Sequence, residues 1–513
     1  MNKILVFILL LLPAFAFGQT PRKINVQSAN SLEFDERTDA QRLVGNVVFE
    51  HEGTLLYCDS AYLYPDNRMD AYSHVRIVSD SVVATGDELR YDGNSKLGVL
   101  QGNVVMTDPD SRLETDLLYY DLANKSASYT TGGVITGERN NLSSIFGQYR
   151  SAERMFYFRK DVVLKNEKYT TESDSLHYST LTEIAYFFGP TTITSEKNKI
   201  YCERGFYDTK NDYSEFIKSA KFESRGQIIE ADTLRYDRKT GHGKAYRDVI
   251  ITDTSEKVVI RGNMADYREE SGEMLVADRA EMQKQFGKDT LFLHADTLLS
   301  LLDTISDKRT LIAHKKAQFY KSDFQGRCDS LVYAEADSMM RLFRNPVIWN
   351  DENQLTADTI FIQLANDELD RLFLQRAGFI ASQVDSLHFN QIKGRDITGY
   401  FEDNELSRVH VRGNGESVYF AEDDDGKYIG INKAVCSDMM IYLDSSSISS
   451  IMFYVEPEAT LFPTNQLPED EMKLRGLRWL GEIRPLKRED IFIWKSAAEK
   501  ADDSRRKRII QAD

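Results

Sequence analysis

A short pattern of apolar and polar residues recurs along most of the chain. It has the form acidic, x, Leu or another apolar residue, x, Tyr, and its clearest copies end at Tyr91, Tyr120, Tyr178, Tyr236, Tyr333 and Phe389. Tyr91 and Tyr120 are 29 residues apart, and weaker copies between the clear ones keep a spacing close to this value. Self-similarity at a fixed period is typical of repeat architectures. The chain is therefore predicted to be a repeat protein with about thirteen units.

A second pattern, rich in Val, precedes the first within several units. It lies at residues 45–49, 102–106, 160–164, 247–251 and 345–349. Both patterns are short, rich in β-branched and aromatic residues, and separated by Asp, Asn, Gly, Ser and Lys, which is typical of strands and turns. Helical spacing of apolar residues is not sustained between residues 25 and 455. The body of the chain is therefore predicted to be all-β.

The repeats predict a groove. Strands that alternate apolar and polar residues bury their apolar faces against neighbouring turns, which makes a long V-shaped or sandwiched groove. One strand per repeat on each face, at about 4.8 Å per strand, gives a length of roughly 60 Å. The positions that recur in register while their neighbours are charged are predicted to face inward, and they are Val48, Leu89, Tyr91, Val105, Leu118, Tyr120, Val163, Leu176, Tyr178, Leu234 and Tyr236.

The two ends of the chain differ from the body. Residues 1–18 have an early Lys, an apolar run and small residues before a cleavage point, which predicts a signal peptide and export. The run is short of the roughly 20 residues that span a bilayer. We expect regular repeats at 25–250, less regular repeats at 251–445, and a Pro-containing tail at 446–513. Ser496 is predicted to cap a short terminal helix that carries Arg505 to Arg508.

The composition and the spacing of Cys and His argue against several classes of function. With 64 Lys plus Arg against 81 Asp plus Glu, the net charge of −17 opposes binding to nucleic acid. Three of the four cysteines, Cys58, Cys202 and Cys328, occupy a repeat slot that elsewhere holds other small residues, so we expect unpaired cysteines. The eight histidines lack zinc spacing, and no acidic pair departs from the repeat. We therefore predict no enzyme, no metal and no cofactor.

The repeat pattern resembles that of the OstA-like proteins of lipopolysaccharide transport, the family of the bridge protein LptA and the N-terminal domain of LptD. Residues 45–64 and 102–120 carry the resemblance most clearly, and the repeat extends over residues 25–445. The resemblance implies an elongated β-jelly roll with an open V-shaped groove that shields the acyl chains of lipopolysaccharide in the periplasm. It also implies edge-to-edge association, with the chain itself or another jelly-roll protein, and an outer-membrane assembly protein as a partner.

Two alternatives remain open at this stage. The first is an exported β-solenoid that acts as an adhesin or binds carbohydrate, with a tightly packed, dry interior. The second is an outer-membrane barrel, which predicts lipid-facing alternation in strands of roughly ten residues and which the charged loops disfavour. An edge strand is also predicted in the first repeat, Leu43 to Tyr64, because it has no Pro to block strand pairing.

Overall fold

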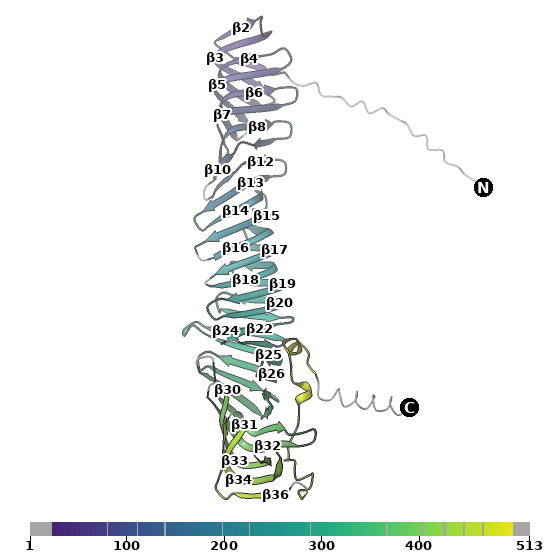
Figure 1. The fold of residues 1–513 in the computed structure, drawn as a ribbon. Helices are drawn as coiled ribbons and strands as arrows, with labels where there is room; N and C mark the ends of the chain where they lie inside the picture. Colours follow the sequence, from purple (N-terminus) through teal and green to yellow (C-terminus); the bar gives the residue numbers. More distant parts are fainter. Residues whose placement is uncertain are drawn as a thin grey trace, which may run out of the picture. The chain divides into compact units, whose positions relative to one another are not determined.

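The structure is a computed structural model that describes residues 23–495 apart from 80, 110, 138–139, 197, 225, 288, 366–367, 403–404, 424–426, 445–446 and 464–465. The chain divides into two compact units, one up to Glu196 and one from Lys197. Figure 1 labels strands of both units. Both predicted terminal elements, the signal peptide at 1–18 and the helix from Ser496, lie outside the described residues.

Antiparallel strands make up the first unit. They are β1 Asn25–Ser28, β2 Ser31–Asp35, β3 Ala40–His51, β4 Thr54–Leu63, β5 Arg68–Ser79, β6 Val82–Asp92, β7 Leu97–Thr107, β8 Ser111–Asp121, β9 Ser126–Tyr129, β10 Gly133–Gly137, β11 Asn140–Ser144, β12 Phe146–Arg150, β13 Met155–Asn166, β14 Tyr169–Ser179 and β15 Ile184–Ser195. Most neighbours in sequence pair as hairpins.

The second unit has the same construction. Its strands are β16 Asn198–Asp208, β17 Tyr213–Ser224, β18 Gln227–Asp237, β19 His242–Asp253, β20 Val258–Arg268, β21 Glu273–Ala277, β22 Glu281–Phe286, β23 Asp289–His294, β24 Thr297–Asp303, β25 Lys308–Tyr320, β26 Phe324–Ala334, β27 Met339–Phe343, β28 Val347–Asn350, β29 Asn353–Thr356, β30 Thr359–Ala365, β31 Glu368–Gln383, β32 Phe389–Glu402, β33 Glu405–Glu422, β34 Tyr428–Asp444, β35 Ser447–Tyr454 and β36 Glu458–Phe462. The helical elements of the described residues are the 3-10 turns η1 Gly481–Ile483 and η2 Arg488–Phe492. The predicted all-β class is confirmed.

Each long strand contributes to two walls. The first half of β8 pairs with β10 and its second half pairs with β9, so the two halves enter separate ladders. We call these the Val wall, which holds the Val-rich pattern and β10, and the Tyr wall, which holds the Tyr pattern and β9. In β7 the change of wall occurs at Gly102 and Asn103, whose φ angles are 78° and 46°. Two residues in this left-handed region make a bulge that bends the strand and shifts its register.

The recurrent acidic residue is explained by this corner. Asp87 accepts a hydrogen bond of 2.8 Å from the side-chain Nδ2 of Asn103 in the bulge of the next strand. The same slot pairs with the next corner elsewhere, as in the 2.7 Å contact between Asp59 and Nδ1 of His74. Repetition of the acid therefore follows from repetition of the bend, because each left-handed corner exposes polar groups that a carboxylate can bind.

The core lies between the two walls. The small slot before the acid faces this core: at Gly86 even a Cβ would come 2.8 Å from Cγ of Leu100, so this unit has glycine in the slot. Cysteine fills the slot at Cys58, Cys202 and Cys328, and all four cysteines are free and buried. The prediction of unpaired cysteines is confirmed.

The N-terminal edge differs from the sequence prediction. The strand of the first repeat, β3, is covered by β1 along its Val-wall half and by β2 along its Tyr-wall half. The prediction that Leu43 to Tyr64 forms the free edge is therefore wrong. The two short segments before this repeat are too short to resemble a repeat unit, yet they supply the outer strands.

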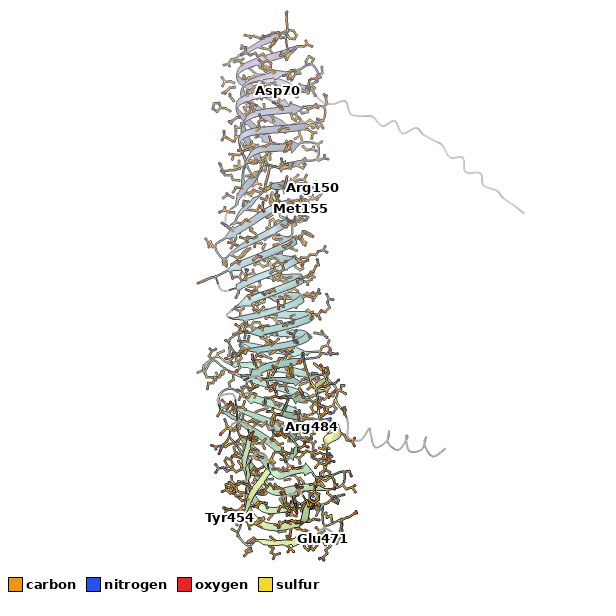
Figure 2. The ribbon with its side chains drawn as sticks, viewed as in Figure 1. Asp70, Arg150, Met155, Tyr454, Glu471 and Arg484 are labelled. Atoms are coloured by element: carbon orange, nitrogen blue, oxygen red, sulfur yellow. The ribbon has the colours of Figure 1, made fainter. Side chains whose placement is uncertain are left out.

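The strands of the second unit continue to Phe462, through β35 and β36, inside the segment that we expected to be a tail. Residues 466–495, the C-terminal strap, then run back over the outer face of the Val wall (Figure 2). Buried glutamines from successive strands bind the strap. Gln391 donates to the carbonyl of Met472 and accepts from the N–H of Leu474, each at 2.8 Å.

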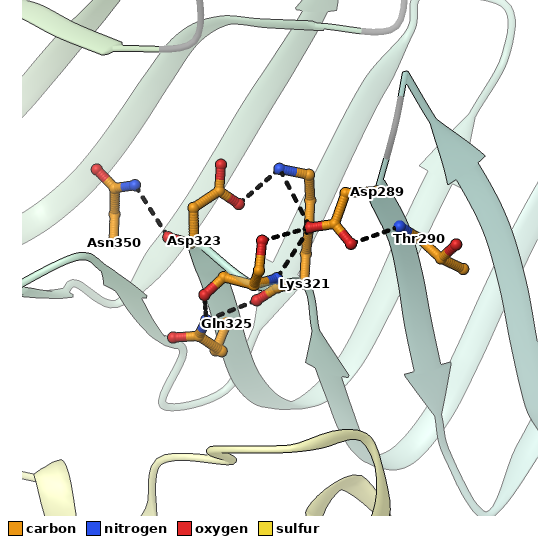
Figure 3. Close-up of polar contacts among 7 residues, drawn as sticks. Asp289, Thr290, Lys321, Asp323, Gln325 and Asn350 are labelled. Atoms are coloured by element: carbon orange, nitrogen blue, oxygen red, sulfur yellow. Dashed lines mark hydrogen bonds and ion pairs between the residues drawn. The ribbon is translucent and has the colours of Figure 1, made fainter.

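Other glutamines repeat this arrangement along the wall. Gln354 bonds to the backbone of Arg478 and Leu480, and Gln325 accepts a 2.7 Å bond from Nε of Arg484. Figure 3 shows Gln325 also donating to the carbonyl of Lys321, within a network in which Asp289 holds the adjacent turn. The strap thus covers an apolar outer face that includes Phe379, Val418 and Phe420 of the same unit.

Candidate functional site

The first unit contains an apolar groove between its two walls. Its cavity volume is about 60 Å³. The Val wall contributes Phe49, Leu56, Ile77, Ala84 and Met106, and the Tyr wall contributes Met69, Leu89, Leu100, Leu118 and Leu122. The lining is apolar because each strand directs alternate side chains inward, and the corner bulge restores this alternation on the second wall.

Polar groups gather at the mouth of the groove. Nδ1 of His51, on the Val wall, lies 2.7 Å from the hydroxyl oxygen of Tyr91, on the Tyr wall. Their ring centroids are 5.6 Å apart, with the planes at 68°. Burial raises the pKa of Tyr91, with a further contribution from the charge of Glu52, so the phenol is neutral over the physiological range.

An ion pair spans the mouth next to these rings. Nζ of Lys96 lies 2.8 Å from a carboxylate oxygen of Glu52. Glu52 belongs to the turn between β3 and β4, and Lys96 to the turn between β6 and β7. The groove is therefore an apolar trough with a polar rim, which is the arrangement that suits an amphiphile.

Four of the predicted inward residues line this groove, namely Leu89, Tyr91, Leu118 and Tyr120. Leu176 lies on β14, further along the first unit. It is buried, and it pairs with Phe158 of the neighbouring strand β13. Tyr178 follows it on β14 and is half-buried.

Two further predicted residues belong to the second unit. Leu234 is buried in its core, and the hydroxyl of Tyr236 bonds to Glu269 on the adjacent turn of the same unit. The structure does not bring this pair into the groove of the first unit. Contact of any of these residues with lipid remains a prediction.

The three predicted valines face the other way. Val48, Val105 and Val163 are half-buried, whereas the residues before them, Val47, Val104 and Val162, are each about 1% exposed or less. The inward placement of Val48, Val105 and Val163 is therefore wrong by one residue. Burial of alternate residues continues across each corner, from Leu43 to Val47 and from Leu100 to Val104, so the second valine of each pattern lies on the opposite face.

Sequence reasoning also missed Phe49, Leu56 and Met106, which line the groove on the Val wall. The signal was present in the alternation of the strands. Counting alternate residues from Leu43 selects Phe49, and counting them from Leu100 selects Met106.

The described residues include no group of three or more His, Cys, Asp or Glu side chains placed to hold a metal ion. Burial raises the pKa of the Cys58, Cys202 and Cys328 thiols to about 12, so they are protonated at neutral pH and are weak nucleophiles and ligands. Among the same residues, no helix is long and apolar enough to cross a membrane.

One protein-family model matches the part of the chain that contains the groove. Residues 21–174 match the family model described as OstA-like protein. This segment of the chain is OstA-like. It contains every residue that lines the groove, from Ile24 to Leu122.

A solved structure similar to the chain is that of LptH, described as the LptA homologous periplasmic component of the conserved lipopolysaccharide transport device from Pseudomonas aeruginosa. The sequence identity is 15%, and the match covers 23% of this chain and 82% of that one, with a TM-score of 0.21. No curated protein matches the chain.

Proposed function

We propose that this protein binds lipopolysaccharide and transfers it, shielding the acyl chains in the groove of its OstA-like segment. The observation that carries the proposal is the groove itself: apolar walls, free space between them and a polar rim. Moving each methylene group from water into such a site is favourable by about 0.8 kcal/mol. The walls would therefore hold the acyl chains while the rim keeps the headgroup in water.

The same features support a transfer role rather than catalysis. Acidic residues of the repeat such as Asp59 and Asp87 contact side chains of the neighbouring corner, so their carboxylates are already engaged in hydrogen bonds. An acyl chain in an apolar trough gains a similar contact energy at each position along it. The chain can therefore slide between neighbouring positions. We propose that the protein acts in the periplasm, without a cofactor, and delivers lipid toward the outer membrane and its assembly protein.

The alternative of an exported β-solenoid that acts as an adhesin or binds carbohydrate predicts a dry, filled interior. The apolar cavity lined by Leu56, Leu100 and Leu118 favours lipid binding instead.

The test is lipid copurification. The protein is expressed in a host that makes lipopolysaccharide, purified from the periplasm, and analysed by native mass spectrometry. We expect lipopolysaccharide with the wild type, and at least about tenfold less with Leu118→Asp, because a buried carboxylate opposes an acyl chain. The control Arg90→Asp puts the same charge on the exposed face of β6. Equal lipid in wild type and Leu118→Asp, with both folded, would contradict the proposal.

A further inference from the structure

Two contacts close the mouth of the groove, and both join the Val wall to the Tyr wall. The ion pair between Lys96 and Glu52 links residues 44 positions apart in the sequence, from turns at the two opposite rims. The hydrogen bond between His51 and Tyr91 lies beside it, one residue before Glu52. We call these four side chains the clasp.

The clasp differs from ordinary ion pairs of the first unit. The side chains of Lys96 and Glu52 are 26% and 28% exposed, whereas Arg112 and Glu114, which pair along one strand, are 51% and 57% exposed. A more covered pair is screened less by water and salt, so it contributes more. His51 is almost fully buried, so its ring closes the space beneath the ion pair.

The position of the clasp gives it a consequence for binding. An acyl chain that enters the groove from the side at this point passes between His51 and Tyr91, and therefore separates Glu52 from Lys96. Once separated, the ammonium of Lys96 stands at the rim of an apolar trough without its carboxylate. An anionic group attached to the acyl chain can replace that carboxylate, since Lys binds phosphate and carboxylate groups as a point charge.

We infer that the clasp is a lateral gate, and that Lys96 selects amphiphiles with an anionic headgroup next to the acyl chain. The inference rests on the proposed function, because it assigns an entry route and a headgroup contact to the same groove. Glu52 and Lys96 then have two positioning roles. Glu52 holds the gate closed through its ion pair, and Lys96 leaves that ion pair to bind the anionic headgroup.

The experiment measures entry of a fluorescent twelve-carbon fatty acid into the purified full chain by stopped-flow fluorescence. Its methyl ester, which lacks the charge, is measured in parallel. We expect Glu52→Gln and Tyr91→Phe each to speed entry about threefold to tenfold, the range expected for loss of one such contact. Glu114→Gln, which removes an ion pair away from the mouth, should enter at the wild-type rate. Circular dichroism and the melting temperature confirm that each variant is folded.

Lys96→Gln distinguishes the role of Lys96 in the gate from its role in binding the headgroup. It should speed entry as Glu52→Gln does, and it should also abolish the preference for the acid over the ester, which Glu52→Gln retains. Wild-type entry rates in Glu52→Gln would overturn the gate and indicate entry from an end of the groove. An unchanged preference in Lys96→Gln would overturn the headgroup contact. If the wild type binds neither probe, the proposed function itself fails.

Discussion

Asn103 donates a 2.8 Å hydrogen bond from its side chain to Asp87, across the bend at which β7 passes from the Tyr wall to the Val wall. Asn103 is held at a φ of 46°, a region that non-glycine residues occupy only with support from their surroundings. The carboxylate supplies that support, and the same contact recurs between Asp59 and His74.

Removing the corner carboxylate should weaken the fold modestly. Asp87→Ala leaves the bulge of β7 without its acceptor, and both partners are exposed, so we expect a loss of about 0.5–1 kcal/mol in the free energy of unfolding. Glu114→Ala removes an acid from a flat strand face and should change stability less. Urea unfolding followed by circular dichroism measures both. Equal losses would mean that the corner contact has no special role.

The buried thiols predict a loss of stability at alkaline pH. Burial raises the pKa of Cys202 from 9.0 to about 12 in the folded protein. The folded state therefore holds the proton more tightly than the unfolded state. The stabilisation is present in full below pH 9 and is lost as the pH rises from about 9 toward 12.

Cys202→Ala should show a smaller fall in the free energy of unfolding between pH 8 and pH 11 than the wild type, at roughly 1 kcal/mol lower stability at pH 7. Iodoacetamide at pH 8 should leave all four thiols of the folded protein unmodified and label them in urea. Rapid labelling of Cys202 without denaturant would show that the slot is open to solvent.

The C-terminal strap should stabilise the second unit through its glutamines. Gln391→Leu removes two buried hydrogen bonds and leaves the carbonyl of Met472 and the N–H of Leu474 without this partner, so we expect a loss of about 2–4 kcal/mol. Gln363 bonds to the carbonyl of Asp337 in a turn away from the strap, and Gln363→Leu is the matched control. Limited proteolysis should cut residues 466–495 sooner in Gln391→Leu. Similar cleavage in both variants would contradict a role for Gln391 in holding the strap.

Association is predicted at the outer strand β2. Leu32 and Phe34 are 55% and 60% exposed there, and β2 is paired with β3 in the described part of the chain. Lys on an edge strand opposes pairing with another chain, so Leu32→Lys with Phe34→Lys should weaken self-association or binding to a second jelly-roll protein. Leu181→Lys, at a turn with 66% exposure, is the control. Size-exclusion chromatography with crosslinking decides: unchanged assembly of the folded double variant would place the interface elsewhere.

Local pattern was enough for part of the structure. The Tyr pattern lies near the ends of β6 and β8. Alternation counted back from Tyr91 and from Tyr120 correctly selects Leu89 and Leu118 as inward residues. Alternation also continues past the bulge at Gly45 and Asn46, from Leu43 to Val47, so the selection of Val48 as an inward residue was wrong because it lies on the opposite face.

Contacts between distant segments could not be predicted in this way. Gln391 and Leu474 are 83 residues apart, and no periodic pattern connects a strand glutamine to a backbone group in the strap. Glu52 and Lys96 are likewise two ordinary turn residues in sequence. Only the folding of the walls toward each other makes them partners.

The proposed position of the acyl chains, between the walls of the OstA-like segment, can be tested at neighbouring residues that lie on opposite faces of a strand. A photo-crosslinking amino acid is placed in turn at Phe49, which lines the groove, and at Val48, which faces away, in cells that make lipopolysaccharide. Leu118 and the exposed Tyr119 form a second pair on the Tyr wall. We expect crosslinks to lipopolysaccharide from Phe49 and Leu118 and background levels from Val48 and Tyr119. Equal capture from both members of each pair, or none from Phe49 and Leu118, would contradict the proposed position.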